Sequence, residues 1–215
     1  MNMRNVNIVA RYESKLLRRD IVFLGFVVIA LVGISLWQMI KQGRVNVFWY
    51  KVALPSSFPF FSMYYYNLVQ VLIALFVCME VVYRERKKDA MEVFLCRPFR
   101  NSEYCIGRFL GIFRMFLFVN ICVLLVCMYI NLWVVGAPFN VWIYVFYLFT
   151  LSIPTLIFVL GCALSISAMV KNRPLSVLVL GLFGLGVYFY LDEWQFGAFD
   201  FWGRNLPNMF SDVVG

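Results

Sequence analysis

The sequence contains no histidine, and its six cysteines include no Cys-x-x-Cys pair. Zinc sites are built mainly from these two residue types, and the common catalytic triads need a histidine base. The composition therefore argues against a zinc centre and against a histidine-based hydrolase. The pattern Gly-x4-Gly-Lys-Ser/Thr is also absent, so any ATP that drives this protein has to bind another chain. We predict no metal, no cofactor and no catalytic residue.

Charged residues are scarce as well. Only 14% of the 215 residues are charged, 63% are hydrophobic, and the mean hydropathy is +0.83. A soluble domain of this length needs far more charge to cover its surface. The net charge of +8 does not indicate a nucleic-acid partner, because the basic residues cluster at the ends of apolar stretches. These features indicate an integral membrane protein surrounded by a lipid bilayer.

Five apolar stretches are long enough to cross the hydrocarbon core, which takes about 20 helical residues. Each has to satisfy its own backbone hydrogen bonds in lipid, so the predicted fold class is all-α. The predicted spans are residues 21–40, 64–82, 109–130, 141–170 and 174–191, within a transmembrane domain of 21–191. Residues 45–63 are aromatic and rich in proline, and we expect them to lie at the outer interface. Pro154 predicts a kink in the long fourth span.

The distribution of basic residues predicts the orientation. With the N-terminus in the cytoplasm, the inner segments hold fourteen basic residues and the outer segments hold four. This excess follows the positive-inside rule. All six tryptophans then lie at or beyond the outer boundary. We predict a multi-pass protein of the cell inner (plasma) membrane with a cytoplasmic N-terminus.

Residues 1–20 mix apolar and basic side chains at helical spacing. The apolar members are Val6, Ile8, Val9, Tyr12, Leu16 and Leu17, among five basic residues. This pattern predicts an amphipathic helix on the inner membrane surface. The alternative is a basic tail that only orients the first span.

The predicted cytoplasmic loop, residues 84–108, reads RERKKDAMEVFLCRPFRNSEYCIGR. Residues 88–96 carry an apolar stripe within a charged frame and end before Pro98, which predicts a short amphipathic helix. Such a helix suits docking onto a cytoplasmic partner. An apolar face that rests on the membrane is an equally good interpretation of the pattern.

These residues resemble the corresponding loop of ABC-2-type permeases, the membrane subunits of ATP-binding-cassette exporters. In that family a Glu/Arg-rich start, a short helix, a proline, a glutamate and a Gly-Lys or Gly-Arg pair follow in this order. Residues 10–20, ARYESKLLRRD, also resemble the interfacial helix that opens such permeases. The resemblance implies a separate ATPase subunit, which the loop contacts, and a second permease half. The loop residues that carry the motif or the implied contact are Glu85, Asp89, Met91, Glu92, Phe94, Arg97, Pro98, Glu103, Gly107 and Arg108.

Permeases of this family have six spans, whereas this sequence shows five. We expect residues 192–215 to form an extracytoplasmic tail that leads to a missing sixth span. The chain would then correspond to the N-terminal part of a permease, as a truncated product or one of two genes.

Several polar side chains fall within the predicted spans. Glu80 and Arg114 lie at similar depths near the inner boundary, so an ion pair between the second and third spans is one interpretation. The other is that each side chain reaches the interface separately. Asn67, Gln70, Asn120 and Ser152 are expected to bond between helices, or to line a path. The small pairs Gly161/Ser165 and Ala163/Ser167 predict close helix packing inside the bundle.

Three functions fit these features. The first is a permease subunit of an ABC-2 exporter, which couples ATP hydrolysis by a separate ATPase to export. The second is a non-transporting anchor or assembly protein whose basic loop binds a soluble partner. The third is an intramembrane enzyme, and it has least support because Glu80 alone supplies no acid–base pair.

Overall fold

The computed structural model describes residues 2–44, 57–85, 100–133, 139–170 and 172–186, and every regular element in these ranges is helical. The elements are α1 (Met3–Leu17), α2 (Ile21–Arg44), α3 (Ser57–Glu85), α5 (Asn101–Trp133), α6 (Val141–Tyr147), the π-helical turn η1 (Leu148–Ser152), α7 (Ile153–Met169) and α8 (Arg173–Gly186). The predicted all-α class is confirmed for the described residues.

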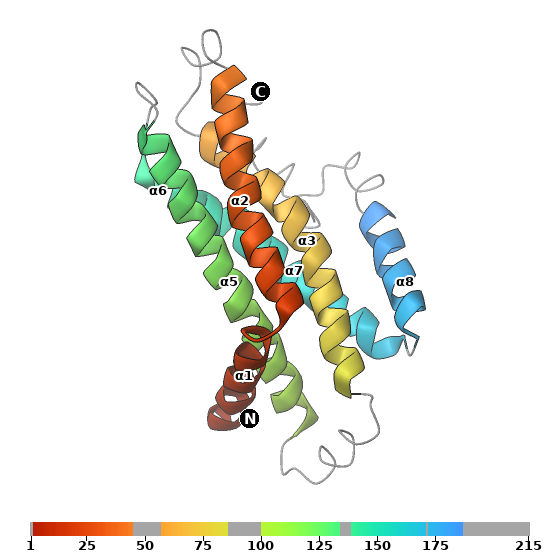
Figure 1. The fold of residues 1–215 in the computed structure, drawn as a ribbon. Helices are drawn as coiled ribbons and strands as arrows, with labels where there is room; N and C mark the ends of the chain where they lie inside the picture. Colours follow the sequence, from red (N-terminus) through yellow and green to blue (C-terminus); the bar gives the residue numbers. More distant parts are fainter. Residues whose placement is uncertain (1, 45–56, 86–99, 134–138, 171, 187–215) are drawn as a thin grey trace.

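The helices form a bundle in which successive long helices alternate in direction (Figure 1). α5 is central, because it contacts α1, α2, α3 and α7. α8 packs on α3 and α7 at the side of the bundle. α1 lies at one end, beside the first turns of α5, and the end of α3 lies at this same end (Figure 1).

Two described helices are long and apolar enough to cross a membrane, namely 101–133 and the run 141–169. A third is added if α1 and residues 21–36 of α2, which meet at a bend of 73°, are treated as one span. Large hydrophobic side chains are exposed along these helices, including Ile29 at 66% and Phe118 at 58%. Exposure of this kind suits a lipid environment and not water.

Short polar residues determine where three helices begin. The side chains of Asn2, Asp20 and Asn140 accept hydrogen bonds from backbone N–H groups two residues ahead, at 3.1, 2.9 and 3.0 Å. This geometry caps a helix N-terminus. α2 and α6 consequently begin at residues 21 and 141, where the predicted spans begin.

The start of α3 differs from the prediction. Residues 57–63, expected to lie in an outer connecting segment, are helical because α3 begins at Ser57. Pro59 falls in the first turn, where the missing N–H of proline has no intrahelical partner to lose. The helix thus begins seven residues before the predicted span at residue 64, and the location of residues 45–63 at the outer interface stays a prediction.

The core of the bundle is aromatic near the α1–α2 turn. Phe23, Phe26 and Phe116 are 2% exposed or less. The Phe23 and Phe116 rings meet edge to face with their centroids 5.5 Å apart. This contact fixes α2 against α5 one turn beyond the point where α1 ends.

Candidate functional site

The first candidate region is the α1–α5 junction, formed by α1 and the first turns of α5. A Cβ atom at Gly107 would lie 2.8 Å from the Val6 carbonyl oxygen, and one at Gly111 would lie 2.8 Å from the Ala10 carbonyl oxygen. The two glycines are four residues apart, so they lie on one face of α5. Their missing side chains let the two backbones approach closely, as small residues do in membrane helix pairs.

Glu103 lies one turn before Gly107 and contacts the N-terminus of α1. Its carboxylate accepts hydrogen bonds from the Asn2 backbone N–H and from the Asn5 side chain, the latter at 3.0 Å. These two hydrogen bonds hold the pKa of Glu103 below its ordinary value. A carboxylate here also balances the positive end of the α1 dipole. Farther along, the Ser14 hydroxyl lies 3.0 Å from the Gly111 carbonyl oxygen and 2.8 Å from that of Ala10.

Two arginines flank this contact. Arg108 is 7% exposed, and its guanidinium carbon lies 5.9 Å from the centre of the Tyr104 ring, within cation–π range. Arg114 is exposed and donates a hydrogen bond to the Asn7 side-chain oxygen at 3.1 Å. Arg114 thus has a partner on α1 that the sequence did not indicate. The ion pair between Glu80 and Arg114 stays a prediction.

The predicted loop residues are only partly described. Six of them lie outside the described residues: Asp89, Met91, Glu92, Phe94, Arg97 and Pro98. Glu85 is the last residue of α3. The structure brings Glu103 and Gly107 together against α1. Sequence reasoning missed Gly111, although the four-residue spacing from Gly107 was a usable signal.

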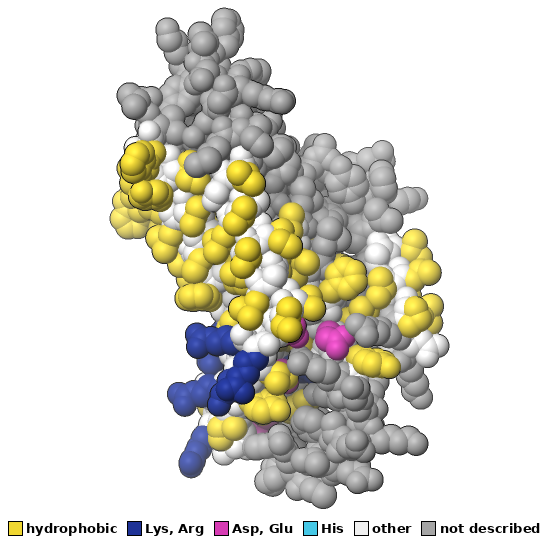
Figure 2. Space-filling view, in the orientation of Figure 1, with side chains coloured by type: hydrophobic (Ala, Val, Ile, Leu, Met, Phe, Trp, Pro, Cys, Tyr) yellow, Lys and Arg dark blue, Asp and Glu magenta, His cyan; other side chains and the backbone are white. Residues whose placement is uncertain are grey.

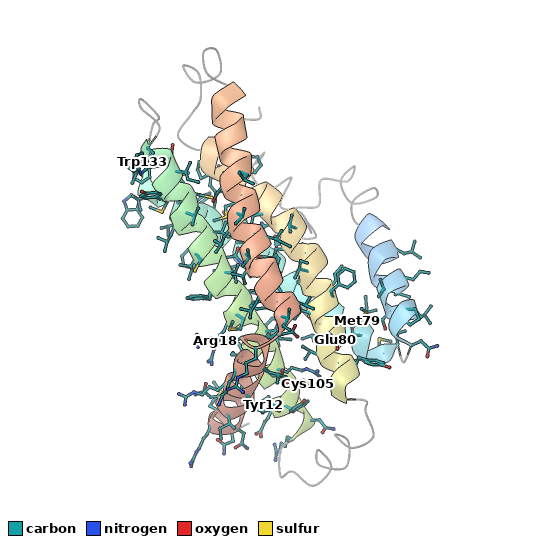
Figure 3. All side chains as sticks on the ribbon, in the orientation of Figure 1. Tyr12, Arg18, Met79, Glu80, Cys105 and Trp133 are labelled. Carbon is teal, nitrogen blue, oxygen red and sulfur yellow. The ribbon has the colours of Figure 1, made fainter. Side chains whose placement is uncertain are left out.

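Charge is concentrated at this end of the bundle. Arg4, Arg11, Lys15 and Arg18 are exposed on α1. Figure 2 shows the Lys and Arg side chains gathered over α1, with hydrophobic side chains covering the helices beyond it. Trp133 lies at the opposite end from Tyr12 and Arg18 (Figure 3).

The second candidate region is the polar core, which we define as Tyr66, Asn67 and Gln70 of α3 with Asn120 of α5. All four side chains are 1% exposed or less. The Asn120 amide donates to the Gln70 side-chain oxygen at 2.6 Å and to the Phe116 carbonyl oxygen at 2.8 Å. The expected bond between helices is therefore present for Gln70 and Asn120.

The π-helical turn η1 contacts α3 near the polar core. Ser152, at its end, is fully buried, and its hydroxyl lies 3.9 Å from the Met63 sulfur. Pro154 follows at the start of α7 and has no N–H to donate to the preceding turn. The turn directly before Pro154 is a π-helical turn, a feature frequent at functional sites, and the kink at Pro154 stays a prediction.

The two pairs of small residues in α7, Gly161/Ser165 and Ala163/Ser167, differ in how closely they are packed. Ala163 and Ser167 are buried, whereas a Cβ at Gly161 would meet nothing within 4 Å. Close packing at Gly161 inside this bundle is therefore a wrong prediction.

In the part of the chain that the structure describes, no group of three or more His, Cys, Asp or Glu side chains could hold a metal ion. No protein-family model matches the chain, and no curated protein matches it. The functional argument therefore depends on the geometry of the two candidate regions.

Proposed function

We propose that this chain is a membrane-spanning permease subunit of an ABC-2-type exporter. In this proposal five helices cross the plasma (inner) membrane, with the N-terminus and the segment between α3 and α5 in the cytoplasm. A separate ATPase subunit hydrolyses ATP, and a second permease half completes the transporter. The observation that carries the proposal is the α1–α5 junction, which ties the first helix to the residues that directly follow the predicted loop.

The surface charge supports the orientation. The exposed basic residues of α1 lie at the end of the bundle where α3 ends and α5 begins (Figures 1 and 2). Trp133 and Trp142, which are 72% and 79% exposed, belong to the ends of α5 and α6 away from α1. Basic residues on the cytoplasmic side and aromatic residues at an interface are the normal pattern.

The length of α5 supports a projecting cytoplasmic part. A helix of 33 residues measures about 50 Å at 1.5 Å per residue, and a typical hydrocarbon core is about 30 Å thick. Several turns of α5 would therefore lie outside the hydrocarbon core. Glu103 and Gly107, in the first two turns, would lie in this projecting part.

The proposed coupling follows from these connections. The ATPase would contact the segment that contains Asp89, Glu92 and Phe94, and its closure on ATP would displace that segment. Because Glu103 and Gly107 are fixed on α1, the displacement would reach α1 and α5 as one unit. α1 leads through a short turn into α2, so three helices would move together and support alternating access.

The test is charge reversal in the predicted loop. The gene's neighbours are first inspected for a P-loop ATPase; the chain is then co-expressed with that ATPase, and both co-purification and permease-dependent ATP hydrolysis are measured. We expect Asp89→Lys with Glu92→Lys to reduce both signals. Asp192→Lys with Glu193→Lys, in the predicted outer tail, is the matched double charge reversal and should leave both unchanged.

The outcomes separate the proposed functions. If no ATPase co-purifies with the wild-type chain, or if the loop variant leaves both co-purification and ATP hydrolysis unchanged, the permease proposal is wrong. A soluble partner that binds the loop without any change in ATP hydrolysis would favour the membrane anchor instead.

A further inference from the structure

The polar core contains side-chain atoms that have no hydrogen-bond partner among the residues that the structure describes. They are both side-chain polar atoms of Asn67, the Gln70 nitrogen, the Asn120 oxygen and the Tyr66 hydroxyl. Asn67 and Asn120 are fully buried, and Tyr66 and Gln70 are 1% exposed. Burying polar atoms without partners in an apolar bundle is unfavourable, and native structures normally satisfy such atoms with protein or with ordered water.

These atoms come from neighbouring positions on α3. Tyr66 and Asn67 lie four and three residues before Gln70, so both side chains adjoin Gln70 on the helix surface. Gln70 contacts Asn120 of α5, and Met63, one turn before Asn67, contacts Ser152 of η1. Asn67 therefore lies between the contact with α5 and the contact with the π-helical turn.

The unpartnered atoms define the chemistry of the occupant. The Asn67 and Gln70 amides and the Tyr66 hydroxyl supply donors, and the Asn67 and Asn120 oxygens supply acceptors. None of the four side chains carries a formal charge at neutral pH, so the set does not favour an ion. A buried water needs two to four polar partners of both kinds.

We propose that Tyr66, Asn67, Gln70 and Asn120 form a binding site for ordered water in the bundle core, between α3, α5 and η1. The water completes the hydrogen bonds that the protein leaves open and joins α3 to α5 beyond the single Gln70–Asn120 bond. This inference does not depend on the proposed transport function.

Radiolytic hydroxyl-radical labelling of the full chain in lipid nanodiscs tests the site, because radicals formed from a bound water modify the side chains beside it. Tyr144 is the internal control. It is as buried as Tyr66, at 1% exposure, but its hydroxyl accepts a hydrogen bond from Asn131 at 2.8 Å. We expect Tyr66 to be labelled several-fold faster than Tyr144 in the wild-type chain.

The variant Asn67→Leu removes two of the unpartnered atoms and keeps the branching and the number of side-chain heavy atoms. It should lower the Tyr66 labelling rate to that of Tyr144 and leave the Tyr144 rate unchanged. Equal, slow labelling of the two tyrosines in the wild-type chain would overturn the proposal, and that comparison needs no variant to fold. An unchanged Tyr66 rate in a folded Asn67→Leu chain would overturn it as well.

Discussion

The α1–α5 junction and the polar core both place polar groups against α5, yet they differ in how the contact is made. At the junction, two glycines bring backbones together, and the Glu103 carboxylate is hydrogen-bonded to α1. In the polar core, α3 and α5 meet through the Gln70–Asn120 side-chain bond, and several polar atoms have no partner among the described residues. The α1–α5 junction therefore resists movement of the two helices against each other, whereas the polar core has hydrogen-bonding atoms left over for a bound molecule such as water. α5 thus makes a close backbone contact with α1 in its first turns and a side-chain contact with α3 within the bundle.

The largest effect is expected at the glycines. Gly111→Ala places a Cβ 2.8 Å from the Ala10 carbonyl oxygen, a backbone atom that cannot move alone. Overpacking of this kind costs about 1–3 kcal/mol, so we expect a clear fall in the melting temperature in detergent. Gly25→Ala is the control, since a Cβ there meets nothing within 4 Å. Alanine is the better helix former by about 1 kcal/mol, so the control should be neutral or stabilising. Equal effects of the two variants would contradict the tight contact.

The next effect is expected in the polar core. Gln70→Leu or Asn120→Leu alone leaves the other amide buried with one partner fewer, which we expect to destabilise the chain by about 1 kcal/mol. The double variant removes both amides and should cost less than the sum of the single changes. Thermal unfolding of all four chains measures this coupling. Simple additivity would mean that the 2.6 Å bond makes no measurable contribution.

A smaller, pH-dependent effect is expected at Glu103. Its pKa is lowered in the folded chain, so its stabilising contribution is present above the ordinary carboxyl pKa and is lost as the pH falls through the folded value. The melting temperature of wild type should exceed that of Glu103→Gln at neutral pH, and the difference should shrink on acidification. A difference that stays constant with pH would show that the charge of Glu103 has no role at the junction.

The smallest effect is expected for Arg114, which is exposed. A hydrogen bond such as the one to Asn7 contributes about 1 kcal/mol or less at an exposed site. A double-mutant cycle with Asn7→Ala and Arg114→Leu should show this coupling in thermal stability. The cycle with Glu80→Gln and Arg114→Leu tests the predicted ion pair, for which each single variant should be more harmful than both together.

The sequence predicts the helices better than it predicts their contacts. Asp20 and Asn140 mark helix starts because capping is local, and the apolar runs that follow are unambiguous. The amphipathic pattern of residues 1–20 predicted α1, but a pattern shows that an apolar face exists without showing what covers it. Val6 and Val9 are buried against α5, while Ile8 and Tyr12 remain exposed on the same helix.

Pairs of small residues show the same limit, because the sequence gives their spacing but not the helix that they contact. The four-residue spacing occurs at Gly107 and Gly111 as well as at Gly161 and Ser165. Among the described residues, Gly107 and Gly111 make close contacts, whereas a Cβ at Gly161 would meet nothing within 4 Å. Both pairs have the four-residue spacing of small residues, so the helix that each pair faces determines whether it packs closely. The sequence predicted that Gln70 and Asn120 bond to other helices, but not that they bond to each other. That pairing depends on how α3 and α5 are positioned along each other, which no local sequence pattern shows.

The bend between α1 and α2 has a mechanical consequence. The two helices meet at 73° across three residues, and α1 is clamped to α5 on the near side of that corner. α2 has 24 residues and therefore measures about 36 Å at 1.5 Å per residue. If α1, α2 and α5 tilted together by roughly 10° about this corner, the far end of α2 would move through about 6 Å for that length. A slight tilt at the junction would thus become a displacement of several ångströms at the opposite end of the bundle.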